Sequence, residues 1–417
     1  MYFTNDGKSA ILFKNRIVRK KGFFMRLTHR ATILACYNGY VTQAICINLA
    51  PLFYLTFQKE FSLTVTAIST LIALNFATQL LVDVIATRYS KHLNLRLVSV
   101  AAHLFSASGL VGMSFLPYVL EPYAGLALSV GLLGVGGGLT EVIISPLIEA
   151  CPTDGKSGNM SLLHSFYCWG QAGVVLLSGI YFSFLDIAVY WRYLPILWAI
   201  IPLLGAFAFC FVPIYRLPGD ADGRSSVRAL FKTSAFWGFL LMMFCAGATE
   251  LTMSQWASAF AESALGIPKE LGDLLGPCMF ALMMGLSRAL YGKFSNLLDL
   301  CFLMKIGCVL CTVAYLLAAF VPIPALSLVS CALCGIGVGI FWPGILSQAA
   351  ASIPMGGISM FALLAVAGDL GCLIGPSVSG TLVDLLGGDL RWAFCFTVPF
   401  PIILLMMLFL KSRKKER

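Results

Sequence analysis

Long apolar stretches separated by short polar segments run through the whole chain. Stretches such as LLSGIYFSFL at 176–185 and PIILLMMLFL at 401–410 are apolar almost throughout, without alternating polar positions. A membrane-barrel strand needs that alternation, whereas a membrane helix needs about twenty apolar residues in succession. The pattern therefore predicts an all-α membrane protein with twelve transmembrane helices, at residues 31–57, 66–86, 97–117, 123–149, 160–185, 193–214, 235–262, 274–293, 299–320, 324–350, 356–384 and 391–411.

A polar segment divides the twelve predicted spans into two sets of six. It is the longest polar interruption between spans and contains Pro218, Gly219 and Gly223 together with four basic residues. We therefore expect a cytosolic arm, a six-helix bundle, a cytosolic linker, a second six-helix bundle and a cytosolic tail, at residues 1–30, 31–214, 215–234, 235–411 and 412–417.

Glycines repeat between the two predicted halves at a constant offset of 201 residues. Weak self-similarity of this kind is typical of duplicated transporters, whose solute site lies where the halves meet. The alternative is that glycine is simply common in membrane helices. The repeated positions are Gly134, Gly136 and Gly138 with Gly335, Gly337 and Gly339, and Gly170 with Gly371.

Composition and charge agree with a membrane location and indicate the topology. Hydrophobic residues make up 59% of the chain and charged residues 11%, with a mean hydropathy of +0.89. Of the 28 Lys and Arg residues, 23 lie in or next to the two chain ends and every second gap between spans. Four lie in the other gaps, and Lys305 lies inside a span. The positive-inside rule then places both termini in the cytosol, so the net charge of +9 reports topology and not a nucleic-acid partner. The apolar segment behind the basic arm is too long for a signal peptide.

The 14 cysteines indicate neither disulfides nor a metal site. Cys308, Cys311, Cys331 and Cys334 have a spacing close to that of a zinc site, but both pairs fall inside predicted spans. A zinc site there would lack the polar groups that orient metal ligands. We therefore expect packing cysteines, no metal and no cofactor.

Three acidic residues lie near the middle of predicted spans. A charged carboxylate in the bilayer costs at least a few kcal/mol, so Glu141, Glu250 and Asp369 are candidates for proton coupling. Glu141 shares one narrow helical face with small residues, which suits a polar cavity wall. Loss of hydration favours the protonated form of a carboxyl group, as a proton carrier requires. The alternative for each is a structural hydrogen bond to a neighbouring helix.

Three local patterns resemble one branch of a known transporter family. The segment GVGGGLTEVIISP at 134–146 is similar to GxGxGxxExxxNP, with Ser145 in place of Asn. Glu250 and Trp256 are similar to ExxxxxW, and the residues from Trp342 to Ser347 are similar to WPxxxS. With twelve spans in two halves, these patterns resemble the major facilitator superfamily over essentially the whole chain, and within it the fucose-galactose-glucose proton symporters.

The resemblance has two departures. Asp83 lacks the Arg-x-Gly that follows the equivalent residue in the family pattern GxxxDRxGRR. The branch also uses an acidic residue in the first span, where this chain offers only Asn38, Gln43 and Asn48.

Polar and aromatic side chains in the spans suit a sugar, because amides bind hydroxyls and aromatic faces cover apolar ring faces. Each alone is more typical of an interhelical hydrogen bond, and only their convergence would make a site. The candidates are Asn38, Gln43, Asn48, Asn75, Gln79, His164, Trp169, Gln255, Trp256 and Trp342. Charge pairs among Asp83, Arg88, Glu149 and Arg288 are expected to close the cytosolic ends of the halves, the alternative being solvated loop charges.

The function that these features favour is proton-coupled symport of a small polar solute, such as a monosaccharide, by alternating access. The alternative is a proton-coupled antiporter that exports drugs or metabolites. Exporters of the superfamily usually carry Gly-Pro-Gly in the fifth span, which here reads WGQAGVVLLSG. No catalytic constellation indicates an enzyme. We expect H⁺ and not Na⁺ as the coupling ion, a monomer, and the plasma membrane, or the inner membrane in a bacterium.

The basic residues predict that both termini and the linker lie in the cytosol. A tag inserted in the linker at 215–234 should therefore be inaccessible to a membrane-impermeant reagent in intact cells and accessible after permeabilisation. A linker tag that reacts in intact cells would contradict this topology.

Overall fold

The computed structural model describes residues 28–90, 93–221, 226–265, 278–321, 323–386 and 391–416. The predicted arm up to residue 27 and the connection at 266–277 lie outside these ranges. Within them the chain is built from helices and contains no strand.

The helices follow the order of the predicted spans. The first half contains α2 (His29–Asn48), η1 (Ala50–Phe53), α3 (Tyr54–Phe61), α4 (Val65–Tyr89), α5 (Leu95–Val119), α6 (Pro122–Ala150), α7 (Lys156–Phe184), α8 (Ile187–Tyr190) and α9 (Tyr193–Phe211). The linker contains α10 (Pro218–Ala221) and α11 (Val227–Lys232). The second half contains α12 (Ser234–Leu265), α14 (Met279–Phe294), α15 (Leu300–Phe320), α16 (Pro324–Val338), α17 (Phe341–Ser352), α18 (Gly357–Leu385), α19 (Arg391–Thr397) and α20 (Pro399–Glu416).

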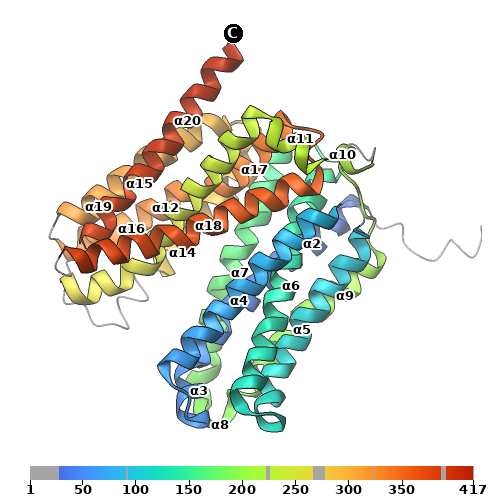
Figure 1. The fold of residues 1–417 in the computed structure, drawn as a ribbon, viewed down its shortest axis with the longest axis vertical. Coiled ribbons are helices and arrows are strands. Elements are labelled where there is room, and N and C mark those ends of the chain that lie inside the picture. The colour runs from blue at the N-terminus through green and yellow to red at the C-terminus, as the bar shows by residue number, and fades with distance from the viewer. Residues whose placement is uncertain are drawn as a thin grey trace, which may run out of the picture.

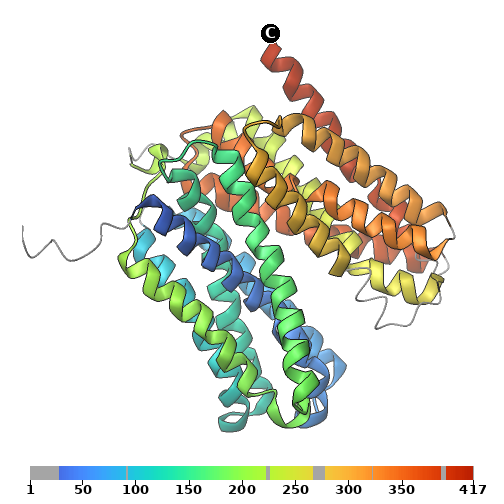
Figure 2. The same cartoon turned by 180° about the vertical axis from the view of Figure 1, so that it is seen from behind.

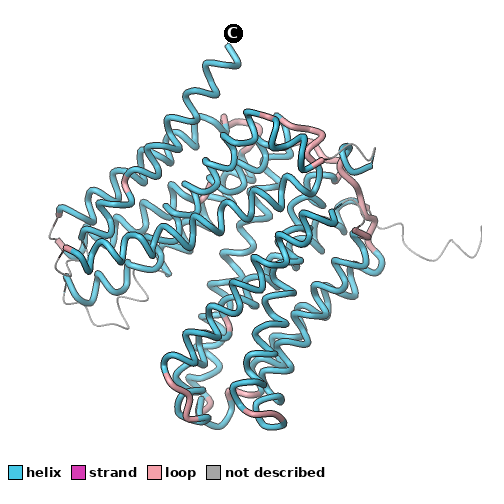
Figure 3. Tube along the Cα trace, viewed as in Figure 1, coloured by secondary structure: helices cyan, strands magenta, loops and turns pink. Residues whose placement is uncertain are grey.

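Two helical bundles form the molecule, one from each half of the chain (Figures 1 and 2). They converge at the end where α10 and α11 lie, which we call the linker end, and their opposite ends lie apart. The tube in Figure 3 shows that most loops lie at the ends of the bundles, with short breaks inside some spans. The bundles are therefore closest at the linker end.

The predicted fold class is confirmed: twelve membrane helices form two pseudo-symmetric bundles of six. Among the described residues, ten spans are long and apolar enough to cross a membrane. The helices α7 and α14 occupy the two remaining predicted positions.

Polar caps begin several helices where the chain leaves a loop. The side chains of Thr64, Asn94 and Asp299 accept hydrogen bonds from backbone N–H groups in the first turns of α4, α5 and α15. Each such cap stabilises a helix start by about 1 kcal/mol. The caps therefore help to fix where these spans begin.

Three spans predicted as continuous helices are interrupted, so those boundaries are corrected. Two breaks fall at Pro51 and Pro399, which have no backbone N–H to continue a helix. The third break separates α16 from α17 and lies within the four residues that precede Pro343. Pro343 cannot donate to the carbonyl of Gly339, and Nε of Arg288 donates to that oxygen instead at 2.8 Å. The buried carbonyl is thus satisfied by a side chain from another helix.

The repeated glycines make equivalent contacts in the two halves. A Cβ added at Gly134 would lie 2.8 Å from the carbonyl oxygen of Asn75 in α4. A Cβ added at Gly335 would lie 2.4 Å from the carbonyl oxygen of Phe280 in α14. The middle glycines of the two repeats, Gly136 and Gly337, pack instead on α5 and α15. Because α4 and α14 are the second spans of their halves and α5 and α15 the third, each half repeats the same backbone packing.

The pair at the same offset in α7 and α18 allows a test of this packing. A Cβ at Gly371 would lie 2.0 Å from the carbonyl oxygen of Phe244, a distance that no Cβ contact tolerates. We expect Gly371→Ala to destabilise the protein by about 1–3 kcal/mol, because overpacking outweighs the helix propensity of alanine. Thermal unfolding in detergent measures the change. Gly173→Ala is the matched control, since nothing lies within 4 Å of its Cβ position, and an equal effect of both substitutions would contradict the prediction.

Candidate functional site

The two halves contact each other through α7 with α14 and through α18 with α4 and α6. Near the linker end these contacts use hydroxyl groups and glycine. The hydroxyls of Ser90 and Ser359 lie 2.6 Å apart, and Ser161 Oγ donates to the carbonyl oxygen of Arg288 at 2.8 Å. A Cβ at Gly158 would collide with Ser295, so the backbones of α7 and α14 approach closely there. Neutral hydrogen bonds therefore close the linker end.

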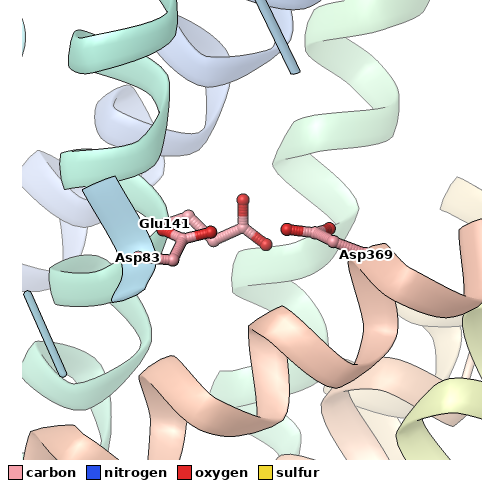
Figure 4. A group of neighbouring side chains, drawn as sticks. All are labelled: Asp83, Glu141 and Asp369. Atoms are coloured by element: carbon pink, nitrogen blue, oxygen red, sulfur yellow. The ribbon is translucent and has the colours of Figure 1, made fainter. Parts of the chain in front are cut away.

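Three carboxylates meet where α4, α6 and α18 pack together (Figure 4). The ligand atoms of Asp83, Glu141 and Asp369 all lie within 4.8 Å of one another. Asp83 is fully buried, whereas Glu141 and Asp369 are partly exposed. Asp83 and Glu141 belong to the first half and Asp369 to the second. This carboxylate cluster therefore spans the interface between the halves.

Two buried amides hold one member of the cluster. Nε2 of Gln43 and Nε2 of Gln79 donate to Oε2 of Glu141 at 2.9 and 2.6 Å. The Oε1 atoms of both glutamines and both carboxylate oxygens of Asp83 are buried and have no hydrogen-bond donor as partner in the described chain. No Lys or Arg of the described residues forms an ion pair with the cluster. Its negative charge is therefore compensated by amide donors on one side only.

The cluster is also the one group of described residues whose acidic, His or Cys ligand atoms are close enough together to hold a metal ion. Carboxylate oxygens are ligands for hard cations as well as bases for protons. The geometry alone is compatible with either occupant.

A second polar site lies around Arg288, which is 3% exposed. Its Nη2 atom pairs with Oε2 of Glu250 in α12 at 3.3 Å, and its Nε atom binds Gly339. Its Nη1 atom donates to Sγ of Cys168 at 3.1 Å and to the carbonyl oxygen of His164 at 3.4 Å. Because Cys168 and His164 belong to α7, the guanidinium of Arg288 also connects the two halves, whereas its ion pair with Glu250 lies within the second half. Glu250 is thus compensated, unlike the carboxylate cluster.

A hydroxyl network joins α2, α6 and α7 within the first half. The hydroxyl of Tyr40 lies 2.7 Å from Oγ of Ser145 and 3.2 Å from Nε2 of His164. Ser145 replaces the Asn of the family pattern and keeps a polar contact. Sequence reasoning missed Tyr40, although its position three residues before Gln43 places both on one face of α2.

Several predicted solute-binding residues bind backbone or lie elsewhere. The amides of Asn38, Asn48 and Asn75 donate to carbonyl oxygens of α9, α2 and α6 at 3.2, 2.9 and 3.4 Å. The contacts of Asn38 and Asn75 are the interhelical hydrogen bonds of the structural alternative, whereas that of Asn48 lies within α2. Gln255 is exposed, and the side chain of Trp256 lies outside the described ones.

Of the other two predicted tryptophans, Trp169 lies at the interface between the halves and Trp342 packs within the second half. Trp169 is 39% exposed, and its ring lies beside the Cβ position of Gly285 in α14. The ring of Trp342 packs over Gly368, where an added Cβ would lie 2.4 Å from Cη2. Its Nε1 donor is buried and has no partner in the described chain. Because Gly368 precedes Asp369, Trp342 packs on the helix segment that carries a member of the carboxylate cluster.

The expected charge pairs at the cytosolic ends need correction. Among the described residues Asp83 lies in the carboxylate cluster, and Arg288 pairs with Glu250. Arg88 is exposed, and Oε2 of Glu149 is buried without a hydrogen-bond partner in the described chain. The helix ends approach through serine and glycine, which leaves no need for a charged pair at the contact.

Twelve helices in two pseudo-symmetric halves, with polar side chains gathered where the halves meet, define a membrane transporter. The match to a family model makes the assignment specific. The chain belongs to the Major Facilitator Superfamily, whose model matches residues 32–359.

Solved transporters share this fold at low sequence identity. FucP, a transporter of this superfamily in the outward conformation, is 15% identical with a TM-score of 0.78, over 91% of this chain and 98% of that chain. The E. coli fucose:proton symporter FucP in a second structure is 13% identical with a TM-score of 0.78, over 92% of this chain and 99% of that chain. The proton:xylose symporter XylE bound to 6-bromo-6-deoxy-D-glucose is 13% identical with a TM-score of 0.76, over 91% and 95%. No curated protein matches the sequence significantly.

The buried ion pair generates a stability prediction. Arg288→Met leaves the carboxylate of Glu250 without its partner, which typically costs about 3–5 kcal/mol for a buried pair. We expect a large loss of thermal stability in detergent and partial recovery when Glu250→Gln is added. Lys293→Met, on the exposed side of the same helix, is the matched control. A double variant as unstable as Arg288→Met alone would show that the pairing is not the cause.

Proposed function

We propose that this chain is a secondary active transporter that couples the uptake of a small polar solute, such as a monosaccharide, to proton entry. The observation that carries the proposal is the carboxylate cluster, which spans the interface between the halves without a basic partner among the described residues. The proton-symport activities named for FucP and XylE support it, since both share the fold.

Electrostatics explains why such a cluster binds protons. Two unit charges about 5 Å apart repel each other by roughly 3 kcal/mol at an effective dielectric constant of about 20. Three ionised carboxylates within 4.8 Å of one another would add three such terms. Binding of one or more protons by the cluster relieves this repulsion, and the protons belong to the group as a whole.

The position of the cluster couples its charge to the conformation. Asp369 comes from the second half, while Asp83 and Glu141 come from the first. With protons bound, the halves can remain together at the linker end. Without them, like charges repel each other across the interface, so proton release favours separation there. A ligand that binds the two arrangements unequally shifts their populations. If the linker is cytosolic, the closed linker end corresponds to an outward-facing transporter.

Unpartnered polar groups beside the cluster suit a solute with hydroxyl groups. The buried Oε1 atoms of Gln43 and Gln79 can accept, and the buried Nε1 of Trp342 can donate. A buried polar group without a partner costs about 1–3 kcal/mol, which a bound hydroxyl would recover. An indole ring also covers the apolar face of a sugar. These three side chains are our proposed contacts for the solute.

A transport assay of Glu141→Gln tests the coupling. Proteoliposomes should accumulate one member of a panel of labelled monosaccharides when a pH gradient is imposed. The variant should lose that accumulation and retain exchange of unlabelled for labelled solute, because the amide keeps the shape of the protonated acid. Asp154→Asn, an exposed loop carboxylate, is the matched control.

Three further outcomes separate the alternatives. Undiminished gradient-driven accumulation by a well-expressed Glu141→Gln protein would remove Glu141 from the mechanism. Accumulation that depends on a Na⁺ gradient and not on pH would identify Na⁺ as the coupling ion. Solute movement against the proton gradient, with protons exchanged for solute, would identify an antiporter.

A further inference from the structure

A cavity of about 310 Å³ lies at the linker end, away from the carboxylate cluster. Its wall combines the end of α6, the start of α7, the linker, the end of α17 and the start of α18. The first half, the second half and the linker therefore all contribute to one half-open cavity. Its volume is at the lower end of the range for small-molecule sites.

The cavity wall contains groups of both charges. Glu149 lines it, and Oε2 of this carboxylate is buried without a hydrogen-bond partner in the described chain. The neighbouring ammonium of Lys156 donates to the backbone carbonyls of Glu149 and Cys151, which caps the end of α6. Arg216, from the linker, lines the cavity with an exposed side chain. The carboxylate of Glu149 already lies near the ammonium of Lys156 and can accept a further hydrogen bond at Oε2, and the exposed guanidinium of Arg216 can bind an anion.

Apolar side chains form a third part of the cavity wall. Leu217, Ile353, Met360 and Phe361 contribute to it, from the linker and from the second half. A ligand that complements the carboxylate, the guanidinium and the apolar side chains has a cationic donor, an anionic group and a small apolar body. An α-amino acid with an apolar side chain has this chemistry, since its ammonium suits Glu149 and its carboxylate suits Arg216.

The cavity depends on the closed arrangement of the linker end. Oδ2 of Asp220 in the linker accepts a hydrogen bond from the backbone N–H of Ile358 at 2.9 Å, which fastens the linker to the start of α18. Separation of the halves would move the wall of α6 and α7 away from that of α17 and α18. A ligand bound to both walls therefore stabilises the closed state over the open one.

We propose that this cavity is a regulatory site for an apolar α-amino acid, which holds the linker end closed and so inhibits transport. The site is separate from the proposed proton and solute site. Its test therefore needs neither an identified solute nor proton coupling.

Binding of labelled L-leucine to the full-length protein in nanodiscs tests the proposal. We expect saturable binding that Glu149→Gln and Arg216→Gln each weaken by about tenfold or more, because each removes a charge-assisted hydrogen bond. Isoamylamine, which lacks the carboxylate, and 4-methylpentanoate, which lacks the ammonium, should compete poorly. Arg228→Gln is the matched control, since Arg228 is an exposed linker arginine that does not line the cavity.

Hydrogen exchange locates the bound probe and detects the closed state. L-leucine should slow exchange at the start of α7 and at residues 357–361, which lie on opposite walls of the cavity. Absence of saturable binding to the unmodified protein would overturn the proposal. So would binding that both substitutions leave unchanged, or protection confined to the helices around Glu141. Ala350→Leu, which reduces the cavity without altering charge, should also weaken binding, and normal binding by this variant would contradict the location.

Discussion

Close approach of helix backbones is the constraint on which this structure depends. In a membrane, helices associate through packing and not through the hydrophobic effect, so small residues determine which helices touch. The glycines of α6 place it against α4 and α5, and those of α16 place it against α14 and α15. Glu141 reaches Asp83 because α6 and α4 are that close, and a chain with larger residues on this face would separate the two carboxylates.

The sequence predicted the fold well because membrane spans are defined by local composition. The apolar stretches located all twelve helices, and the 201-residue glycine offset predicted equivalent packing in the two halves. The interruptions were missed because a proline in an apolar run can also be accommodated within a helix, as Pro146 is in α6. Whether the helix breaks depends on what satisfies the freed carbonyl, and at Gly339 that is the side chain of Arg288 from another helix.

The polar site was less predictable because its members are far apart in sequence. The cost of placing a charged carboxylate in the bilayer identified Glu141, Glu250 and Asp369 individually. No local pattern indicates that Asp83 lies beside Glu141 and Asp369, or that Arg288 pairs with Glu250. Those contacts arise from tertiary packing, within each half for Asp83 with Glu141 and Arg288 with Glu250, and between the halves for Asp369. This packing gives the acids two different surroundings. Glu250 has a guanidinium partner, whereas the three acids of the carboxylate cluster contact only amides or each other. The compensated acid is suited to holding structure together, and the uncompensated group is suited to changing its charge.

The hydroxyl contacts at the linker end have a consequence for how the transporter responds to its surroundings. Dissolved salt screens charges and leaves neutral hydrogen bonds almost unchanged. The contact between Ser90 and Ser359 therefore has no large dependence on ionic strength, unlike a charged pair at the same place. When the halves separate, water can replace each hydroxyl partner at little enthalpic cost. A closure of this kind therefore opens equally readily at high and at low ionic strength.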